Sequence, residues 1–322
     1  MIAAFPTAAD FRAAHELVRE HAHRTPLLSS RSLSDAAGCR AWLKAESLQR
    51  TGSYKLRGPL NKLPRLSEEE RRAGVVCSSA GNHAQGVALA AALHGIRAVV
   101  VMAENATPSK IAATRGYGAE VVQHGSIWDE ANEKALELVH EEGLTYVHPF
   151  DDLDLITGQG TLGLEIHDDL PEVDVVVVPI GGGGLISGVS LALKALKPGV
   201  RVIGVESAGA PAMKRSVEAG RRVVLDEVTC RIDGLVVKQV GESTFEIVRR
   251  FVDDIVTVPD QQIYEALLWT MSRTKIVVEG AAAAPVAALL QGLVPVSPDD
   301  NVACVLSGGN VNLDQLRGLT WN

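Results

Sequence analysis

Short apolar runs rich in valine and alanine alternate with amphipathic stretches along most of the chain. Short β-branched runs favour buried strands, whereas apolar residues spaced three and four apart favour helices. The predicted strands span residues 41–45, 75–78, 96–102, 120–123, 146–148, 175–180, 201–205 and 302–306. The predicted helices span residues 7–23, 81–94, 108–116, 129–142, 160–168, 185–196, 211–219, 245–251, 261–274 and 278–290.

Strands that are separated by helices indicate βαβ units, which build parallel sheets flanked by helices. The sequence therefore predicts an α/β fold, with residues 25–28 leading into a turn and residues 221–241 irregular. Polar loops near residues 50 and 148 place the domain boundaries. We expect a large domain of residues 1–50 plus 148–322 and a small domain of residues 51–147.

Four consecutive glycines, Gly181, Gly182, Gly183 and Gly184, follow an apolar run and precede a helical pattern that Pro198 ends. Glycines let a backbone approach an anion closely, and the first N–H groups of a helix have no internal partner. We therefore interpret this glycine loop as a phosphate cradle. A tight turn without a ligand is the simpler alternative. A dinucleotide site also stays open, because Glu206 ends the next apolar run.

Composition argues against several classes of protein. The 322 residues are 46% hydrophobic with a formal net charge of −8, and no basic cluster suggests nucleic-acid binding. The uncharged stretch 175–193 contains Pro179 and several glycines, so it would make a poor membrane helix. The N-terminus lacks a signal-peptide pattern, and the scattered cysteines indicate free thiols in a reducing compartment. We expect a cytoplasmic protein that binds neither nucleic acid nor membrane.

Small polar residues follow three predicted strands, at the carboxyl ends where open parallel sheets bind ligands. They stand at residues 78–83, in the glycine loop and at residues 307–310. Another polar stretch holds Lys55 beside Arg57. Such a pair is usually solvated, whereas a desolvated lysine has a lowered pKa and can form a Schiff base. Residues 49–59 therefore hold either a surface pair or a reactive amine.

Six motifs occur in one order along the chain. They are Ser53-Tyr54-Lys55-Leu56-Arg57-Gly58, Ser79-Ala80-Gly81-Asn82-His83-Ala84-Gln85-Gly86, Gly158-Gln159-Gly160-Thr161, the glycine loop, Asp233-Gly234 and Ser307-Gly308-Gly309-Asn310. Together they resemble the fold-type-II pyridoxal-phosphate enzymes, specifically the serine/threonine dehydratase and serine racemase branch. The resemblance implies two domains with parallel sheets flanked by helices, similar to the β subunit of tryptophan synthase. It also implies pyridoxal 5′-phosphate as cofactor and a homodimer or homotetramer.

The resemblance further implies the residues that hold the cofactor. Lys55 would bind it as a Schiff base and then serve as the catalytic base. The glycine loop and the N–H of Leu185 would bind its phosphate. Contacts to the rest of the cofactor would come from Tyr54, Asn82 on the ring oxygen, Gly234, and Ser307 facing the pyridine nitrogen. The substrate carboxylate would bind at Ser79, Ala80, Gly81, Asn82 and His83.

Three positions depart from relatives in this branch. Ala80 stands where racemases carry a serine that serves as a second acid and base, so we expect little racemisation. Tyr54 replaces a phenylalanine found in many relatives. A cation site of some relatives would use Glu206 and Ala210, but Ala212 replaces its aspartate. Because hard cations need several oxygen ligands, we expect no metal.

The resemblance implies α,β-elimination of a 3-hydroxy amino acid, L-threonine or L-serine or both, to a 2-oxo acid and ammonia. Phe150-Asp151-Asp152 resembles the segment found in threonine-acting members. Serine racemase with side dehydratase activity is one alternative. Dehydration of a bulkier substrate, such as 3-phenylserine or 3-hydroxyaspartate, is another. A dinucleotide-binding protein is the third, although it leaves Lys55, Asn82 and Ser307 unexplained.

Overall fold

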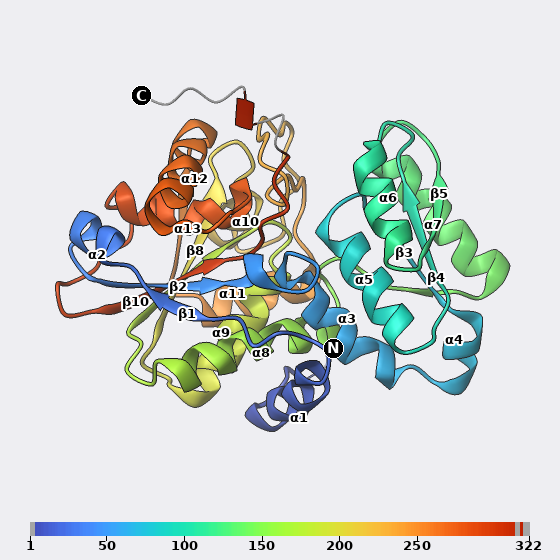
Figure 1. Cartoon of the computed structure of the whole chain (residues 1–322), viewed down its shortest axis with the longest axis horizontal. Coiled ribbons are helices and arrows are strands. Elements are labelled where there is room, and N and C mark those ends of the chain that lie inside the picture. The colour runs from blue at the N-terminus through green and yellow to red at the C-terminus, as the bar shows by residue number, and fades with distance from the viewer. Residues whose placement is uncertain (1–3, 313–315, 318–322) are drawn as a thin grey trace.

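The computed structural model describes residues 4–312 together with 316 and 317. It contains two parallel-type sheets, each flanked by helices, which form two lobes (Figure 1). This confirms the predicted α/β class. The smaller sheet draws all its strands from residues 75–146, whereas the larger sheet draws its strands from both sides of that segment. The division into domains at residues 50 and 148 stays a prediction.

The larger sheet has the strand order β1-β2-β10-β7-β8-β9. These strands are β1 (Leu27–Ser29), β2 (Arg40–Ala45), β7 (Val175–Pro179), β8 (Arg201–Ser207), β9 (Asp254–Val258) and β10 (Asn301–Leu306). All neighbours run parallel except β1, which pairs antiparallel with β2 at the edge. The β7 residues are fully buried, as a continuous apolar run in a doubly covered parallel sheet requires.

The smaller sheet has the order β5-β4-β3-β6, and all its pairs are parallel. Its strands are β3 (Val75–Ser78), β4 (Ala98–Met102), β5 (Glu120–Gln123) and β6 (Thr145–Tyr146). The flanking helices α5 (Asn82–Leu93), α6 (Pro108–Gly116) and α7 (Trp128–Glu142) lie close to their predicted bounds. In Figure 1 these elements form the lobe on the right.

Three helices meet at glycines near the middle of the molecule. They are α3 (Arg57–Lys62), α8 (Leu153–Asp169) and α9 (Gly184–Leu196). A Cβ on Gly158 of α8 would lie 2.9 Å from the Gly58 Cα of α3. A Cβ on Gly188 of α9 would lie 2.6 Å from the Gly160 backbone nitrogen. Glycines at both crossings therefore allow α8 to pack backbone to backbone against helices on two sides.

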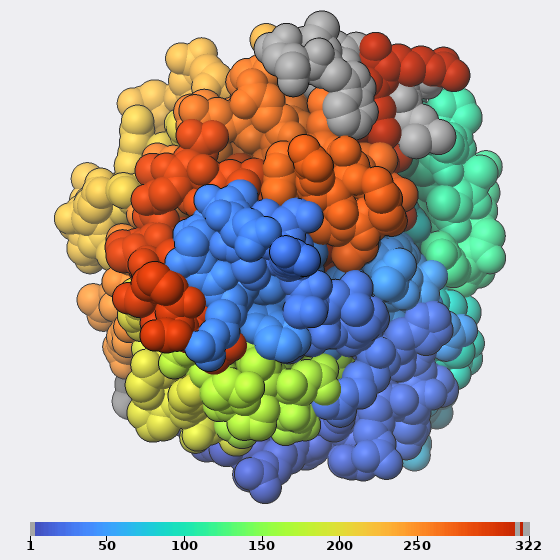
Figure 2. Space-filling view, turned by 60° about the vertical axis from the view of Figure 1, so that its left-hand side comes forward, coloured from blue at the N-terminus to red at the C-terminus, as the bar shows by residue number. Residues whose placement is uncertain are grey.

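Seven further helices complete the fold in the described part of the chain. They are α1 (Ala8–Arg19), α2 (Arg31–Ala37), α4 (Glu68–Ala73), α10 (Ala212–Ala219), α11 (Glu242–Phe251), α12 (Asp260–Thr274) and α13 (Gly280–Leu290). Figure 1 shows α4 in the right-hand lobe. Figure 2 shows the N-terminal region in blue beside the red C-terminal region, which agrees with the pairing of β2 and β10. Among the described residues, no helix is long and apolar enough to cross a membrane.

Several elements differ from the sequence prediction. Residues 27–29 form an edge strand where we expected a turn, and β9 was not predicted. The helices α2, α3 and α4 were also missed. The α8 helix begins at Leu153 rather than at residue 160, because Asp152 caps it by accepting the Leu155 backbone N–H at 2.9 Å.

Candidate active site

Lys55 lies in a single 3₁₀ turn, Tyr54–Leu56, that is fastened to two other segments. The Tyr54 backbone N–H donates to the Ser307 carbonyl at 3.0 Å, and Ser53 forms a β-bridge with Gly308. On the other side α5 packs against the turn, since a Cβ on Gly86 would lie 2.6 Å from the Lys55 carbonyl oxygen. The turn therefore holds Lys55 between the end of β10 and the helix that follows β3.

The amine of Lys55 points into the protein. Its Nζ donates to the Pro149 carbonyl at 2.7 Å and lies 5.3 Å from the centroid of the Tyr54 ring. Burial disfavours the charged ammonium and lowers the pKa of Lys55 to about 8. Lys55 as a whole is partly buried, whereas Arg57 is fully buried, with its guanidinium bound to Glu46 and Glu165. The surface-pair interpretation of Lys55 and Arg57 is therefore wrong.

The glycine loop sits at the start of α9, next to the segment that Lys55 contacts. Gly183 is the N-cap residue with φ +94°, a left-handed conformation that favours glycine. A Cβ on Gly182 would collide with the Phe150 ring, and one on Gly184 would lie 2.8 Å from the Phe150 carbonyl oxygen. Because Pro149 binds Lys55 and Phe150 packs on the loop, one short segment joins the amine to the cradle.

This arrangement fits the phosphate of pyridoxal 5′-phosphate. The first hydrogen bond of α9 runs from the Ser187 N–H to the Gly183 carbonyl, so the N–H groups of Gly184, Leu185 and Ile186 precede the helical ladder. Such groups, together with a glycine backbone, form an anion site. Gly234 lies beside the loop, because a Cβ on Gly181 would collide with the Gly234 carbonyl oxygen. Gly234 itself has φ +87°, in the left-handed region. The predicted phosphate ligands thus lie in one place, as does Gly234.

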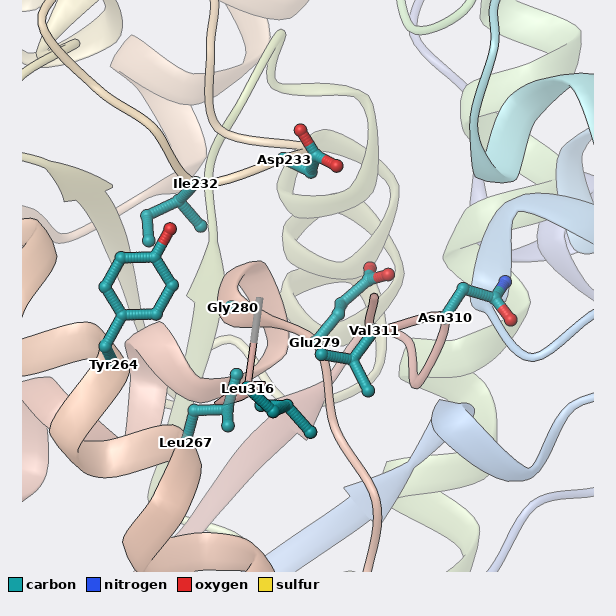
Figure 3. A pocket seen from close by; sticks show the side chains of 9 residues that line it. All are labelled: Ile232, Asp233, Tyr264, Leu267, Glu279, Gly280, Asn310, Val311 and Leu316. Carbon is teal, nitrogen blue, oxygen red and sulfur yellow. The ribbon is translucent and has the colours of Figure 1, made fainter. Parts of the chain in front are cut away.

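Asn82 is held by a carboxylate that the sequence prediction missed. Its amide nitrogen lies 2.8 and 3.0 Å from the two carboxylate oxygens of Glu279, and its amide oxygen accepts from Asn310 at 2.8 Å. Glu279 is buried, which raises its pKa to about 7. The signal was a lone acid next to the alanine-rich run of α13. Figure 3 shows Glu279 and Asn310 lining one pocket together with Asp233.

The predicted substrate loop connects β3 to α5. Gly81 is the N-cap residue of α5, and its N–H donates to the Ser79 hydroxyl at 3.2 Å. The His83 ring is buried, and its Nε2 lies 2.9 Å from the Val147 carbonyl oxygen. Burial lowers the pKa of His83 to about 3. His83 therefore stays neutral and offers the loop its backbone rather than a charged ring. Ala80 is partly buried in the same loop.

The acids of the 150–152 segment hold helices. Asp151 accepts the backbone N–H groups of Ser243 and Thr244 at 3.0 and 3.1 Å and so caps α11 from across the fold. Asp152 caps α8 and binds Lys62 at 2.7 Å. These contacts give the two acids a structural use, and the segment's likeness to threonine-acting members remains an expectation about substrate.

Glu206 has a structural role as well. It is buried, and its two oxygens accept the Met213 and Lys214 N–H groups at 2.8 Å each, at the start of α10. A carboxylate in this position stabilises the helix N-terminus and is unavailable to a nucleotide ribose. Within the described part of the chain, no group of three or more histidine, cysteine, aspartate or glutamate residues forms a possible metal site.

Comparison with known proteins agrees with this geometry. The family model described as "Pyridoxal-phosphate dependent enzyme" matches residues 18–308. The chain belongs to the pyridoxal-phosphate dependent enzymes. Among relatives of this family, the L-threonine ammonia-lyase of Thermotoga maritima is 48% identical over 310 residues, covering 96% of this chain and 77% of the relative. A catabolic L-threonine dehydratase of Staphylococcus aureus is 43% identical, covering 96% and 90%.

Solved structures place the fold within the same family. The processed form of threonine deaminase isoform 2 from Solanum lycopersicum matches with a TM-score of 0.92 at 38% identity, covering 97% of this chain and 92% of that chain. Maize serine racemase matches with a TM-score of 0.93 at 34% identity, covering 98% and 97%. The fold-type-II prediction and pyridoxal phosphate as cofactor are thereby confirmed.

Proposed function

We propose that the chain is an ammonia-lyase that converts L-threonine and L-serine to a 2-oxo acid and ammonia. The observation that carries the proposal is the buried amine of Lys55, which binds Pro149 next to the residue that packs on the glycine loop. The relatives named L-threonine ammonia-lyase and L-threonine dehydratase support this choice of substrate. The similarity to maize serine racemase keeps racemisation as the second activity to measure.

In this proposal each residue has one task. Pyridoxal phosphate, when bound, withdraws electrons from the Cα atom of the amino acid. Lys55 would hold the cofactor covalently until the amino group of the substrate displaces it, and the freed Lys55 amine would then take the Cα proton, for which its lowered pKa is useful at neutral pH. Backbone N–H groups at Asn82 and His83, the first two residues of α5, bind the substrate carboxylate.

The direct test incubates the purified holoenzyme with L-threonine, L-serine, 3-phenylserine and 3-hydroxyaspartate. We expect 2-oxobutanoate and ammonia from threonine, pyruvate from serine, and little D-serine, because Ala80 cannot deliver a proton. If only the bulky substrates release an oxo acid, threonine and serine are not the substrates. If D-serine is the main product from L-serine, the enzyme is a racemase rather than a lyase.

The pH dependence of cofactor loading follows from the Lys55 amine. Only the neutral amine attacks an aldehyde, and its pKa lies near 8 rather than 10.5. We expect the loading rate of apoenzyme to rise about tenfold per pH unit below 8 and to level off above it. Stopped-flow absorbance measures this rate, and N-acetyl-lysine in parallel corrects for ionisation of the cofactor. A rate that keeps rising to pH 10 would mean that the amine is solvated.

We also propose a cytoplasmic location and a homodimer or homotetramer. All four cysteines are free and buried, as is usual in reducing compartments. Light scattering on the purified holoenzyme measures the molar mass, and a mass near the monomer value of 34.1 kDa would contradict the oligomer.

A further inference from the structure

Gln159 is a fully buried amide whose polar atoms have no partner. Its exposed fraction is 0%, and neither Nε2 nor Oε1 makes a hydrogen bond. A glutamine side chain offers two N–H donors and an oxygen acceptor, and buried polar groups of this kind are nearly always paired. The hydrogen-bond partner of Gln159 must therefore be supplied by a bound group or by a rearrangement of the neighbouring side chains.

The carboxamide of Gln159 is aimed at the glycine loop. Its Oε1 lies 3.0 Å from the position that a Cβ on Gly184 would occupy, at the first residue of α9. The neighbouring residue Gly160 packs against Gly188 of α9, so the crossing of the two helices fixes this direction. Rotation of the carboxamide by half a turn places the NH₂ group where the oxygen now lies.

A second unpaired polar group stands in the first turn of α9. Ser187 is fully buried, its hydroxyl has no partner, and its N–H makes the first hydrogen bond of the helix. Gln159 and Ser187 come directly before Gly160 and Gly188, the two glycines at which α8 and α9 cross. Two buried side-chain donors without partners, on Gln159 and Ser187, thus lie near the free N–H groups at the start of α9.

We propose that Gln159, assisted by Ser187, is a ligand of the cofactor phosphate that acts in addition to the backbone of the glycine loop. The proposal rests on the proposed function, because it takes the loop as the phosphate site. The Gln159 NH₂ group donates to a phosphate oxygen, and this bond satisfies a donor that has no partner within the protein. The Ser187 hydroxyl, in the first turn of α9, supplies a second donor that has no partner within the protein. Both groups are neutral, so they add donors without adding charge.

The test compares two ligands that differ only in the phosphate. Apoenzyme is prepared with hydroxylamine and titrated with pyridoxal phosphate and with pyridoxal, and binding is followed by visible absorbance. Gln159→Met keeps the shape of the side chain but removes its donors. We expect the Kd for pyridoxal phosphate to rise about 10- to 100-fold, the range for a hydrogen bond to a charged group, while the Kd for pyridoxal changes less than twofold.

Thermal unfolding supplies a second readout that does not depend on turnover. Since the unpaired amide costs stability only while it lacks the phosphate, Gln159→Met should raise the Tm of the apoenzyme and lower the stabilisation that the cofactor confers. The exposed Gln123→Met on β5 is the matched control and should change neither value. Should Gln159→Met fail to fold, Ser187→Ala takes its place and should weaken pyridoxal phosphate binding selectively.

Equal weakening of both ligands, or an unchanged Kd for pyridoxal phosphate, would overturn the proposal. An unchanged Kd in Ser187→Ala, where that variant is used, would overturn it too. Failure of the proposed function looks different, because the wild-type apoenzyme would then bind pyridoxal phosphate without forming an active lyase, or would not bind it at all.

Discussion

Replacing Lys55 with alanine is expected to lower turnover of L-threonine by at least about 10³-fold. One amine performs two tasks here, covalent attachment of the cofactor and removal of the Cα proton, and the proton transfer alone contributes about 10²–10⁴-fold. The side chain lies in a rigid turn between Ser307 and α5, so no neighbouring amine can replace it without moving the backbone. Turnover is measured by oxo-acid release from the purified variant.

The Lys55 variants also have an expected spectrum. Lys55→Ala loses the visible absorbance of the covalently bound cofactor, yet retains cofactor that dialysis removes, because the glycine loop is unchanged. Lys55→Arg is the matched control: it keeps a long cationic side chain but cannot deprotonate, so it should be equally inactive. An alanine variant within tenfold of wild-type turnover would show that Lys55 is not the base.

The alternation of strands and helices was predictable because parallel strands buried on both faces form continuous apolar runs. Val175–Pro179 and Val75–Ser78 are of this kind, and both are wholly buried. The edge strands gave weaker signals. Only part of Asp254–Val258 is buried, so its run mixes polar and apolar residues, and Leu27–Ser29 is three residues long. Their pairing depends on the sheet beside them rather than on their own sequence.

The α8 helix shows a different limit of sequence analysis. Gly158 and Gly160 have low helix propensity and interrupt the apolar pattern, so a shorter helix was predicted. Both glycines lie where another helix backbone approaches, against Gly58 and Gly188 respectively. Each glycine is thus required by a residue that is distant in the sequence, 100 residues away for Gly158 and 28 residues away for Gly160.

The site was predictable as far as its motifs. The order of Lys55, Asn82, the glycine loop and Ser307 along the chain placed them in one family, and the structure brings their segments together. Glu279 was missed, and Gln159 stood in one of the motifs without a role, because both acquire significance only through burial.

Replacing Arg57 with methionine is expected to lower the free energy of unfolding by about 3–5 kcal/mol. The fully buried guanidinium binds both oxygens of Glu46 at 2.7 and 2.8 Å and both oxygens of Glu165 at 2.8 and 2.9 Å. Lys44, also buried, binds Glu165 at 2.7 Å. Methionine leaves the buried Glu46 carboxylate without a cation, and an uncompensated buried charge strongly destabilises the folded state. Urea unfolding followed by circular dichroism measures the change.

Arg97→Met is the control for this substitution. Arg97 makes similar contacts to Glu120 and Glu142, but its side chain is 41% exposed, so the loss should stay within about 1 kcal/mol. Arg57→Lys keeps a cation but cannot bridge two carboxylates with paired hydrogen bonds, and it should fall between methionine and wild type. Because Arg57 begins the helix that follows Lys55, its loss should also increase the Kd for pyridoxal phosphate. Equal losses in the free energy of unfolding for Arg57→Met and Arg97→Met would contradict the claim that burial makes the Arg57 ion pairs costly to break.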